Sequence, residues 1–91
     1  FQGAGLGIGD RILEVEGLRV ENAVDYYNVE AGFLCGQRVA LKVKRKDGSM
    51  ANVSCDIPLA WAAYLGMEVG GDKDGKPRVT TMFPLSPAQQ A

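Results

Sequence analysis

Two runs of alternating apolar and polar residues, joined by an Asp-Gly turn, constrain the fold of this chain more than any other feature. Residues 38–45 and 50–57 both alternate, and Asp47-Gly48 lies between them. Alternation with a period of two is typical of a strand with one buried face, and Asp-Gly favours a tight hairpin turn. The sequence therefore predicts an antiparallel hairpin. The residues expected on the buried face of its first strand are Val39, Leu41 and Val43.

Three further segments favour strands. Residues 10–17 alternate, with Ile12 and Glu14 on one parity and Leu13 and Val15 on the other, and stop at a glycine. Residues 78–83 are rich in β-branched side chains, and another strand is expected from Met67 onward. Twelve glycines in 91 residues indicate many turns and short elements.

Two segments favour helices. Asn22 is a good N-cap for a helix expected over 23–34, although Gly32 weakens its last turn. Ser86-Pro87 has the cap and first-position residues of a second, short helix. The longer helix carries two apolar rows, which are Tyr26, Val29 and Phe33 in one and Val24, Tyr27, Ala31 and Leu34 in the other.

Length and composition exclude several classes of function. A chain of 91 residues is one small domain with a modest core. Ten Lys and Arg nearly balance eleven Asp and Glu, which argues against nucleic-acid binding through a basic face. The absence of histidine excludes Ser-His-Asp and Cys-His catalysis and imidazole zinc sites. No apolar run is long enough to span a membrane and no signal peptide is visible, so we expect neither membrane insertion nor a cofactor.

Three other motifs are read as ordinary structure. Gly5-Leu-Gly7-Ile-Gly9 precedes a strand, whereas a dinucleotide-binding loop follows one and opens a helix. Asp72-Lys-Asp74-Gly75 lacks the remaining ligands of a calcium loop. Cys35 and Cys55 have no neighbouring ligands for a metal. They are interpreted as two small buried residues, with a disulfide as the alternative.

Residues 64–69, Tyr-Leu-Gly-Met-Glu-Val, are the strongest candidate for a binding site. A glycine between two apolar residues at the start of a strand lets consecutive backbone N–H groups point at one spot. Such a nest binds an anion, for example the terminal carboxylate of a peptide. Leu65, Met67 and Val69 share one face, which either walls an apolar pocket or belongs to an ordinary core strand.

Together these pieces resemble a PDZ domain of the bacterial type found beside HtrA-like serine proteases. The resemblance implies an α+β, mainly β fold, a partly open barrel or sandwich of roughly five or six strands capped by two helices. It also implies a periplasmic or cell-envelope location. The segments that carry the resemblance are 4–17, 20–26, 36–48, 64–67 and 79–91, the last of which contains Ser86-Pro87-Ala88.

The order of these segments departs from the family. PDZ domains of this type place the "YLG" and "SPA" segments first, whereas here they follow the segment that begins at Gly5. We therefore predict one circularly permuted domain over 4–91, with 4–58 as the usual C-terminal half and 59–91 as the usual N-terminal half. Residues 1–3 resemble the remnant of an expression tag. The alternative is a slice through tandem domains, whose halves complete one fold within a chain or between swapped chains.

The resemblance implies a peptide-binding module and not an enzyme. C-terminal tails or extended segments of other proteins would lie antiparallel to the strand from Met67, between it and the helix around 26–33. The glycine loop at 5–8 also mimics the binding loop, but Gly9-Asp10 leads straight into a strand, so 64–67 is preferred. The residues expected to contact the peptide are Asp25, Tyr26, Val29, Phe33, Tyr64, Leu65, Gly66, Met67, Glu68 and Val69.

Two points bear on what the site would bind. Asp25 or Tyr26 is expected to meet the ligand's third residue from the end. Residues 59–63 contain no Lys or Arg, although some family members place a basic group there to hold the carboxylate. The second hypothesis is a structural or self-association domain that uses the same sheet edge without a peptide.

Overall fold

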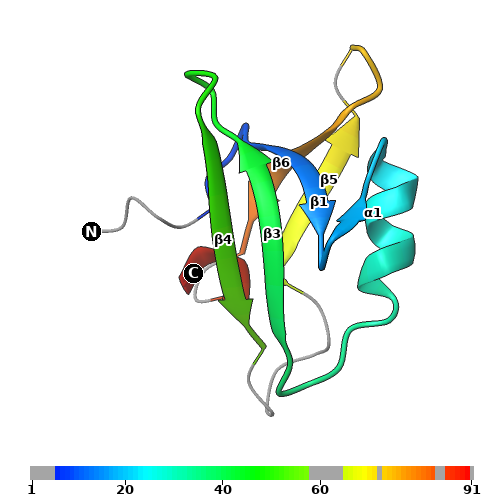
Figure 1. Ribbon diagram of the computed structural model, residues 1–91, viewed down its shortest axis with the longest axis vertical. Coiled ribbons are helices and arrows are strands. Elements are labelled where there is room, and N and C mark those ends of the chain that lie inside the picture. Colours follow the sequence, from blue (N-terminus) through cyan, green and yellow to red (C-terminus); the bar gives the residue numbers. More distant parts are fainter. Residues whose placement is uncertain (1–5, 58–64, 72, 84–85, 91) are drawn as a thin grey trace.

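A computed structural model describes residues 6–57, 65–71, 73–83 and 86–90 of the chain. In these ranges six strands form one antiparallel sheet in the order β4-β3-β1-β6-β5, with β2 paired beside β1 (Figure 1). The elements are β1 (Arg11–Val15), β2 (Leu18–Arg19), α1 (Ala23–Glu30), β3 (Arg38–Lys44), β4 (Met50–Asp56), β5 (Met67–Gly71), β6 (Pro77–Met82) and α2 (Pro87–Gln90).

The predicted mainly β, α+β class is confirmed, and the sheet is open, with β4 and β5 at its two edges. Strands from the two halves of the sequence meet inside this sheet, because β1 pairs with β6. The Gly9 N–H donates to the Val79 carbonyl at 2.8 Å, and the Val79 N–H donates to the Asp10 carbonyl at 2.9 Å. The segments before and after residue 58 therefore contribute to one sheet and one core.

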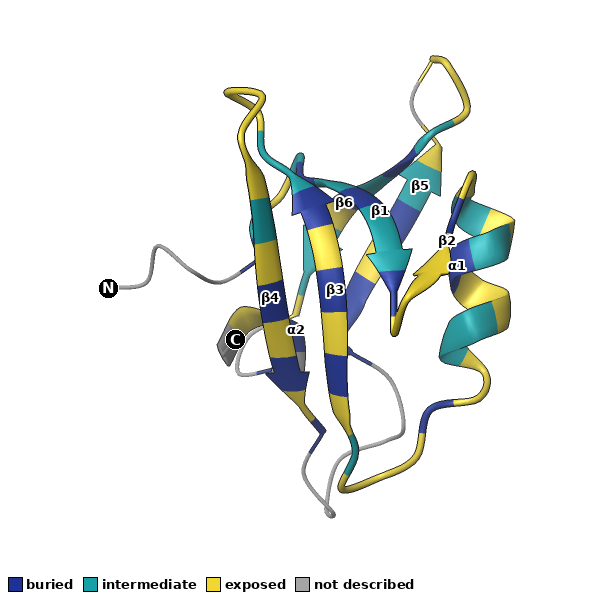
Figure 2. Cartoon of the chain, viewed as in Figure 1, coloured by how far each residue is buried: buried dark blue, intermediate teal, exposed yellow. Residues whose placement is uncertain are grey.

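The predicted hairpin is present as β3 and β4, which pair without interruption from Arg38 opposite Asp56 to Lys44 opposite Met50. Val39, Leu41 and Val43 are buried, as the alternation predicts, and Figure 2 shows buried and exposed residues alternating along both strands. The turn is closed by a bond from the Arg45 N–H to the Ser49 carbonyl at 2.8 Å. The strands end one residue earlier than predicted, at Lys44 and Asp56.

The parity predicted for the first strand is wrong. Ile12 and Val15 are both fully buried, whereas Leu13 is only partly buried. The register against β3 shifts between Ile12 and Glu14, and such a bulge moves the following residues to the other face. The two-residue strand β2 was not predicted either. It follows a tight turn in which Glu16 and Gly17 both have positive φ, at 52° and 78°.

Helix α1 begins as predicted but is shorter. Asn22 caps it, with its side chain accepting from the Asp25 N–H at 2.8 Å. The helix ends at Glu30 and not at 34, so Phe33 lies in the following loop, where it is nevertheless buried. Of the second apolar row, Val24, Tyr27 and Leu34 are exposed.

The second half of the sequence folds close to expectation where it is described. Strand β5 starts at Met67, and β6 starts at Pro77, one residue before the predicted start. Residues 87–90 form a single helical turn, in which the Ser86 hydroxyl accepts from the Gln89 N–H at 3.2 Å. The described helices include none that is long and apolar enough to cross a membrane.

The interpretation of both cysteines as buried is wrong for one of them. Cys55 is buried on β4, but Cys35 is exposed in the loop before β3, and neither cysteine forms a disulfide, so that alternative is not observed either. Exposure of Cys35 follows from the early end of α1, which leaves residues 31–37 as a loop.

The two thiols are expected to differ strongly in reactivity. Burial, with a smaller contribution from the charge of Asp56, raises the pKa of Cys55 to about 12, so little thiolate forms at neutral pH. A maleimide or aromatic disulfide reagent should therefore modify one thiol in the native chain and two in denaturant, as counted by mass spectrometry. A Cys35→Ser variant should lose the fast reaction, and equal labelling of both thiols would contradict the packing around Cys55.

Candidate peptide-binding edge of the sheet

Strand β5 forms one edge of the sheet, and helix α1 stands beside it (Figure 1). The Phe83 N–H donates to the Gly66 carbonyl at 2.8 Å, so the backbone of Gly66 faces β6. In an antiparallel ladder successive residues alternate between the two sides. Val69, and by alternation Met67, therefore direct their N–H groups to the outer edge, where the described residues provide no further strand.

The loop before β5 is fixed on both sides of Gly66. Gly66 has a φ of 80°, a conformation that glycine adopts without steric cost, and this turns the chain into the strand. The carbonyl of the preceding Leu65 accepts from the Ala88 N–H of α2 at 2.8 Å. The side chains of Leu65, Met67 and Val69 are buried in the hydrophobic core, so the structure favours the core-strand alternative for them over an open apolar pocket.

The outer edge of β5 is occupied by a side chain of α1. The Val69 N–H donates to the hydroxyl oxygen of Tyr27 at 2.8 Å. Tyr27 is 42% exposed, so this bond lies at the rim of the molecule and not in its core. A hydroxyl thus takes the place that the carbonyl of an added strand would take.

A carboxylate of α1 lies at the start of the same edge. The Leu65 N–H points to Oε2 of Glu30 at 3.5 Å, and the hydroxyl of Tyr26 donates to the same oxygen at 2.9 Å. Burial raises the pKa of Glu30, and the hydrogen bonds from Tyr26 and Leu65 oppose that rise. Burial, followed by the neighbouring Glu30 charge, also raises the pKa of Tyr26, which therefore stays protonated and donates. The predicted anion nest faces an anion that the chain itself supplies.

The structure brings some of the predicted contact residues to this edge and directs others away. The Asp25 carboxylate accepts from the Glu21 N–H at 3.0 Å and so caps α1. Tyr26 is fully buried, and Phe33 is buried beyond the end of the helix. Val29 is partly buried against the core, and Glu68 is exposed on β5. Tyr64 lies outside the described residues.

Two residues at the edge, Tyr27 and Glu30, were missed from the sequence. They lie three positions apart on α1, so they share one face of the helix. The only hint in the sequence is that the hydroxyl of Tyr27 and the carboxylate of Glu30 are spaced to lie on one face of a helix. In the sequence Tyr27 belongs to an apolar row and Tyr26 is the residue expected at the groove, because the sequence of a helix does not fix its orientation against its neighbours.

Comparison with known proteins finds no relative of this chain. No family model, curated protein or solved structure matches the chain. The described residues contain no group of three or more side chains placed to hold a metal ion. The interpretation of the edge therefore depends on its geometry.

Proposed function

We propose that this chain is a peptide-recognition module of the PDZ type, in circularly permuted order, that adds an extended segment of another protein to β5. The observation that carries the proposal is the state of the outer edge of β5. Its Val69 N–H is satisfied by the side chain of Tyr27 and not by a neighbouring strand. A bond to one side chain at the rim can be exchanged for a bond to a ligand carbonyl without unfolding any element.

Strand addition supplies the binding free energy in this proposal. The ligand backbone would accept from the outward N–H groups of Met67 and Val69, and each bond contributes about 0.5–1.5 kcal/mol net. Apolar ligand side chains would pack beside α1, where burial of one side chain contributes about 1.5–3 kcal/mol. After the cost of association, we expect micromolar affinity, on the order of −8 kcal/mol.

The ligand class follows from Glu30. Its carboxylate lies at the Leu65 N–H, where a PDZ-type site would hold the terminal carboxylate of a peptide. A second carboxylate there would meet a like charge in a partly buried place, which costs binding energy. We therefore propose that the chain prefers extended segments or uncharged ends to free C-termini.

The permuted order is supported by the pairing of β1 with β6. In PDZ domains of this type, the segment that β1 resembles follows the "SPA" motif, and the strand that β6 resembles precedes the motif. In this chain these two strands are paired. Hydrogen bonds at Gly9, Asp10 and Val79 join the two halves in one sheet.

Tyr27→Phe is expected to strengthen peptide binding by about fivefold, because the ligand no longer has to displace the hydroxyl from the Val69 N–H. The measurement is a titration with peptides that end in an apolar residue, followed by the backbone amide signals of Met67 and Val69. Asn28→Ala, an exposed change on the same helix, is the matched control and should leave the affinity unchanged. No response of β5 to a broad set of peptides would overturn the proposed function.

A second candidate is self-association through the same edge. It is favoured by the burial of Leu65, Met67 and Val69, which leaves backbone hydrogen bonding as the main attraction that β5 itself offers. A mass that rises with concentration in light scattering, together with an unchanged response to peptides, would select this candidate.

A further inference from the structure

The cations of the chain are gathered around two neighbouring cavities that share Arg11. Eight of the ten Lys and Arg residues line these cavities, although the whole chain carries a net charge of −1. Only three of the eleven acidic residues line them. The cationic residues are Arg11, Arg19, Lys42 and Lys76 at the first cavity, and Arg11, Lys44, Arg45, Lys46 and Arg78 at the second. The acidic ones are Glu14, Glu21 and Asp47.

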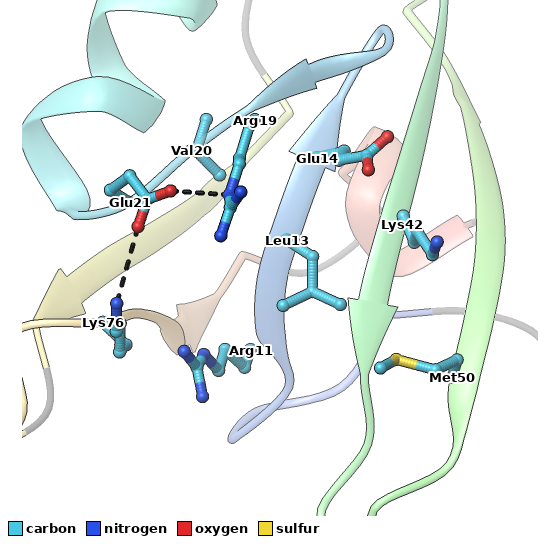
Figure 3. Close-up of a pocket in the computed structure, with 9 residues that line it drawn as sticks. All are labelled: Arg11, Leu13, Glu14, Arg19, Val20, Glu21, Lys42, Met50 and Lys76. Atoms are coloured by element: carbon cyan, nitrogen blue, oxygen red, sulfur yellow. Dashed lines mark ion pairs between the residues drawn. The ribbon is translucent and has the colours of Figure 1, made fainter.

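The first cavity, of about 250 Å³, has its positive charges partly compensated. Glu21 forms ion pairs with Arg19 at 2.6 Å and with Lys76 at 3.5 Å (Figure 3). Glu14 lies directly opposite Lys42 on β3 and Arg19 on β2. Opposite charges in such cross-strand positions stabilise a sheet. Each lining cation of this cavity except Arg11 is therefore paired with a carboxylate or lies opposite one.

The second cavity, of about 320 Å³, is different. Arg11 lies directly opposite Lys44 on one neighbouring strand and directly opposite Arg78 on the other. Like charges in directly opposite positions destabilise a sheet. Among the ion pairs of the described residues, none involves Arg11 or Lys44. A row of three cations thus crosses three strands without an acidic residue inserted into it.

Hydrogen bonds and an ion pair hold the residues around this row in place. Nη1 of Arg78 donates to the Gly9 carbonyl at 3.0 Å, which is a neutral partner. Asp10 forms an ion pair with Arg45. The single lining carboxylate, Asp47, accepts from the backbone and hydroxyl of Ser49 at 2.9 and 2.6 Å, and these bonds lower its pKa.

We infer that the second cavity is a phosphate-binding site, in which a phosphate group lies over the row Lys44–Arg11–Arg78. A phosphate carries up to two charges and three acceptor oxygens, so it matches several converging cations better than one carboxylate does. The planar guanidinium group of Arg can donate two parallel hydrogen bonds to the oxygens of a phosphate. The residues that line the cavity include no aromatic side chain that could stack on a nucleotide base. The site would therefore recognise the phosphate group and not a base. The phosphate group belongs either to a soluble compound or to a phospholipid head group.

Inorganic pyrophosphate is the soluble probe, titrated into the intact chain against sodium chloride of equal ionic strength. We expect saturable binding with amide shifts at Arg11, Lys44 and Arg78. Lys44→Gln should weaken this binding by about tenfold, because it removes one charge-assisted contact. Lys42→Gln is the matched control, since it removes the same charge two residues away on the same strand, where Glu14 lies opposite. It should change the affinity by less than about twofold.

Vesicles separate the two sources of the phosphate. Co-sedimentation with phosphatidylcholine vesicles, with and without phosphatidylserine, measures head-group binding. Retention by the anionic vesicles only, lost in Lys44→Gln, would support the head group, and pyrophosphate binding without retention would support a soluble ligand. The absence of both, or equal weakening by Lys42→Gln and Lys44→Gln, would overturn the inference. Arg11→Gln gives a second reading of the row, and it should also raise the melting temperature by removing the like-charge contacts.

Discussion

Glu30→Gln is expected to raise the affinity for a peptide with a free C-terminal carboxylate by about tenfold, a change of about 1.4 kcal/mol. The reason is that Glu30 holds a carboxylate at the Leu65 N–H, so the wild-type chain opposes a second negative charge there. Glutamine keeps an oxygen that accepts from Tyr26 and Leu65 but carries no charge. Calorimetric titration with one peptide as free acid and as amide measures the effect, which rests on the proposed function.

The amide form of the peptide is the internal control, because its affinity should change by less than about twofold. Glu68→Gln is the matched variant, since it removes the same charge from an exposed position on β5. The pH dependence gives an independent check. The pKa of Glu30 is raised from 4.5, so protonation as the pH falls toward that raised value should strengthen free-acid binding in the wild type only. Equal gains for acid and amide would contradict the role assigned to Glu30.

Asp10→Ala is expected to lower the free energy of unfolding by about 3 kcal/mol. Asp10 is 4% exposed, and its carboxylate contacts Nη1 of Arg45 and accepts from the Gly7 N–H at 2.8 Å. Without it, the guanidinium of Arg45, whose side chain is 19% exposed, loses its acidic partner in a poorly hydrated place. The backbone of Asp10 also pairs with β6, so the loss would loosen the junction between the two halves of the sequence. Urea denaturation followed by circular dichroism measures the change.

Asp56→Ala is the matched control for this prediction. It breaks the bond between Arg38 and Asp56, in which both side chains are 71% exposed, and such surface pairs contribute less than about 1 kcal/mol. Similar losses of unfolding free energy in the two variants would contradict this prediction. They would show that the ion pair of Asp10 contributes no more than an ordinary surface pair and does not hold the two halves together.

Local features of the fold followed from the sequence because their causes lie within a few residues. Alternation over 38–44 and 50–56 and the Asp-Gly turn predict the β3–β4 hairpin, since a strand of period two must bury one face. Asn22 predicts the start of α1, because its side chain satisfies an N–H three residues away. The end of the same helix was not predicted, because it depends on Phe33 leaving the helix to enter the core.

The candidate sites needed contacts between residues far apart in the chain. The motif at Gly66 drew attention to β5, but the orientation of α1 decided that Tyr27 and Glu30, and not Asp25 or Tyr26, reach its outer edge. Likewise, a nearly balanced composition predicted no basic face. The register of β1 against β3 and β6 nevertheless sets Arg11 between Lys44 and Arg78.

The sequence by itself determined the strands other than β2, where the hairpin turns and which residues cap the helices. These depend on periodicity and on hydrogen bonds within a turn or two of the backbone. Only the tertiary structure decided that β1 joins the two halves and that a bulge places Ile12 and Val15 on one face. It also decided which side chains bond to the outer edge of β5. Those outcomes are set by pairing and packing between segments that are far apart in the sequence. Local patterns of residues do not reveal the free energies of such contacts.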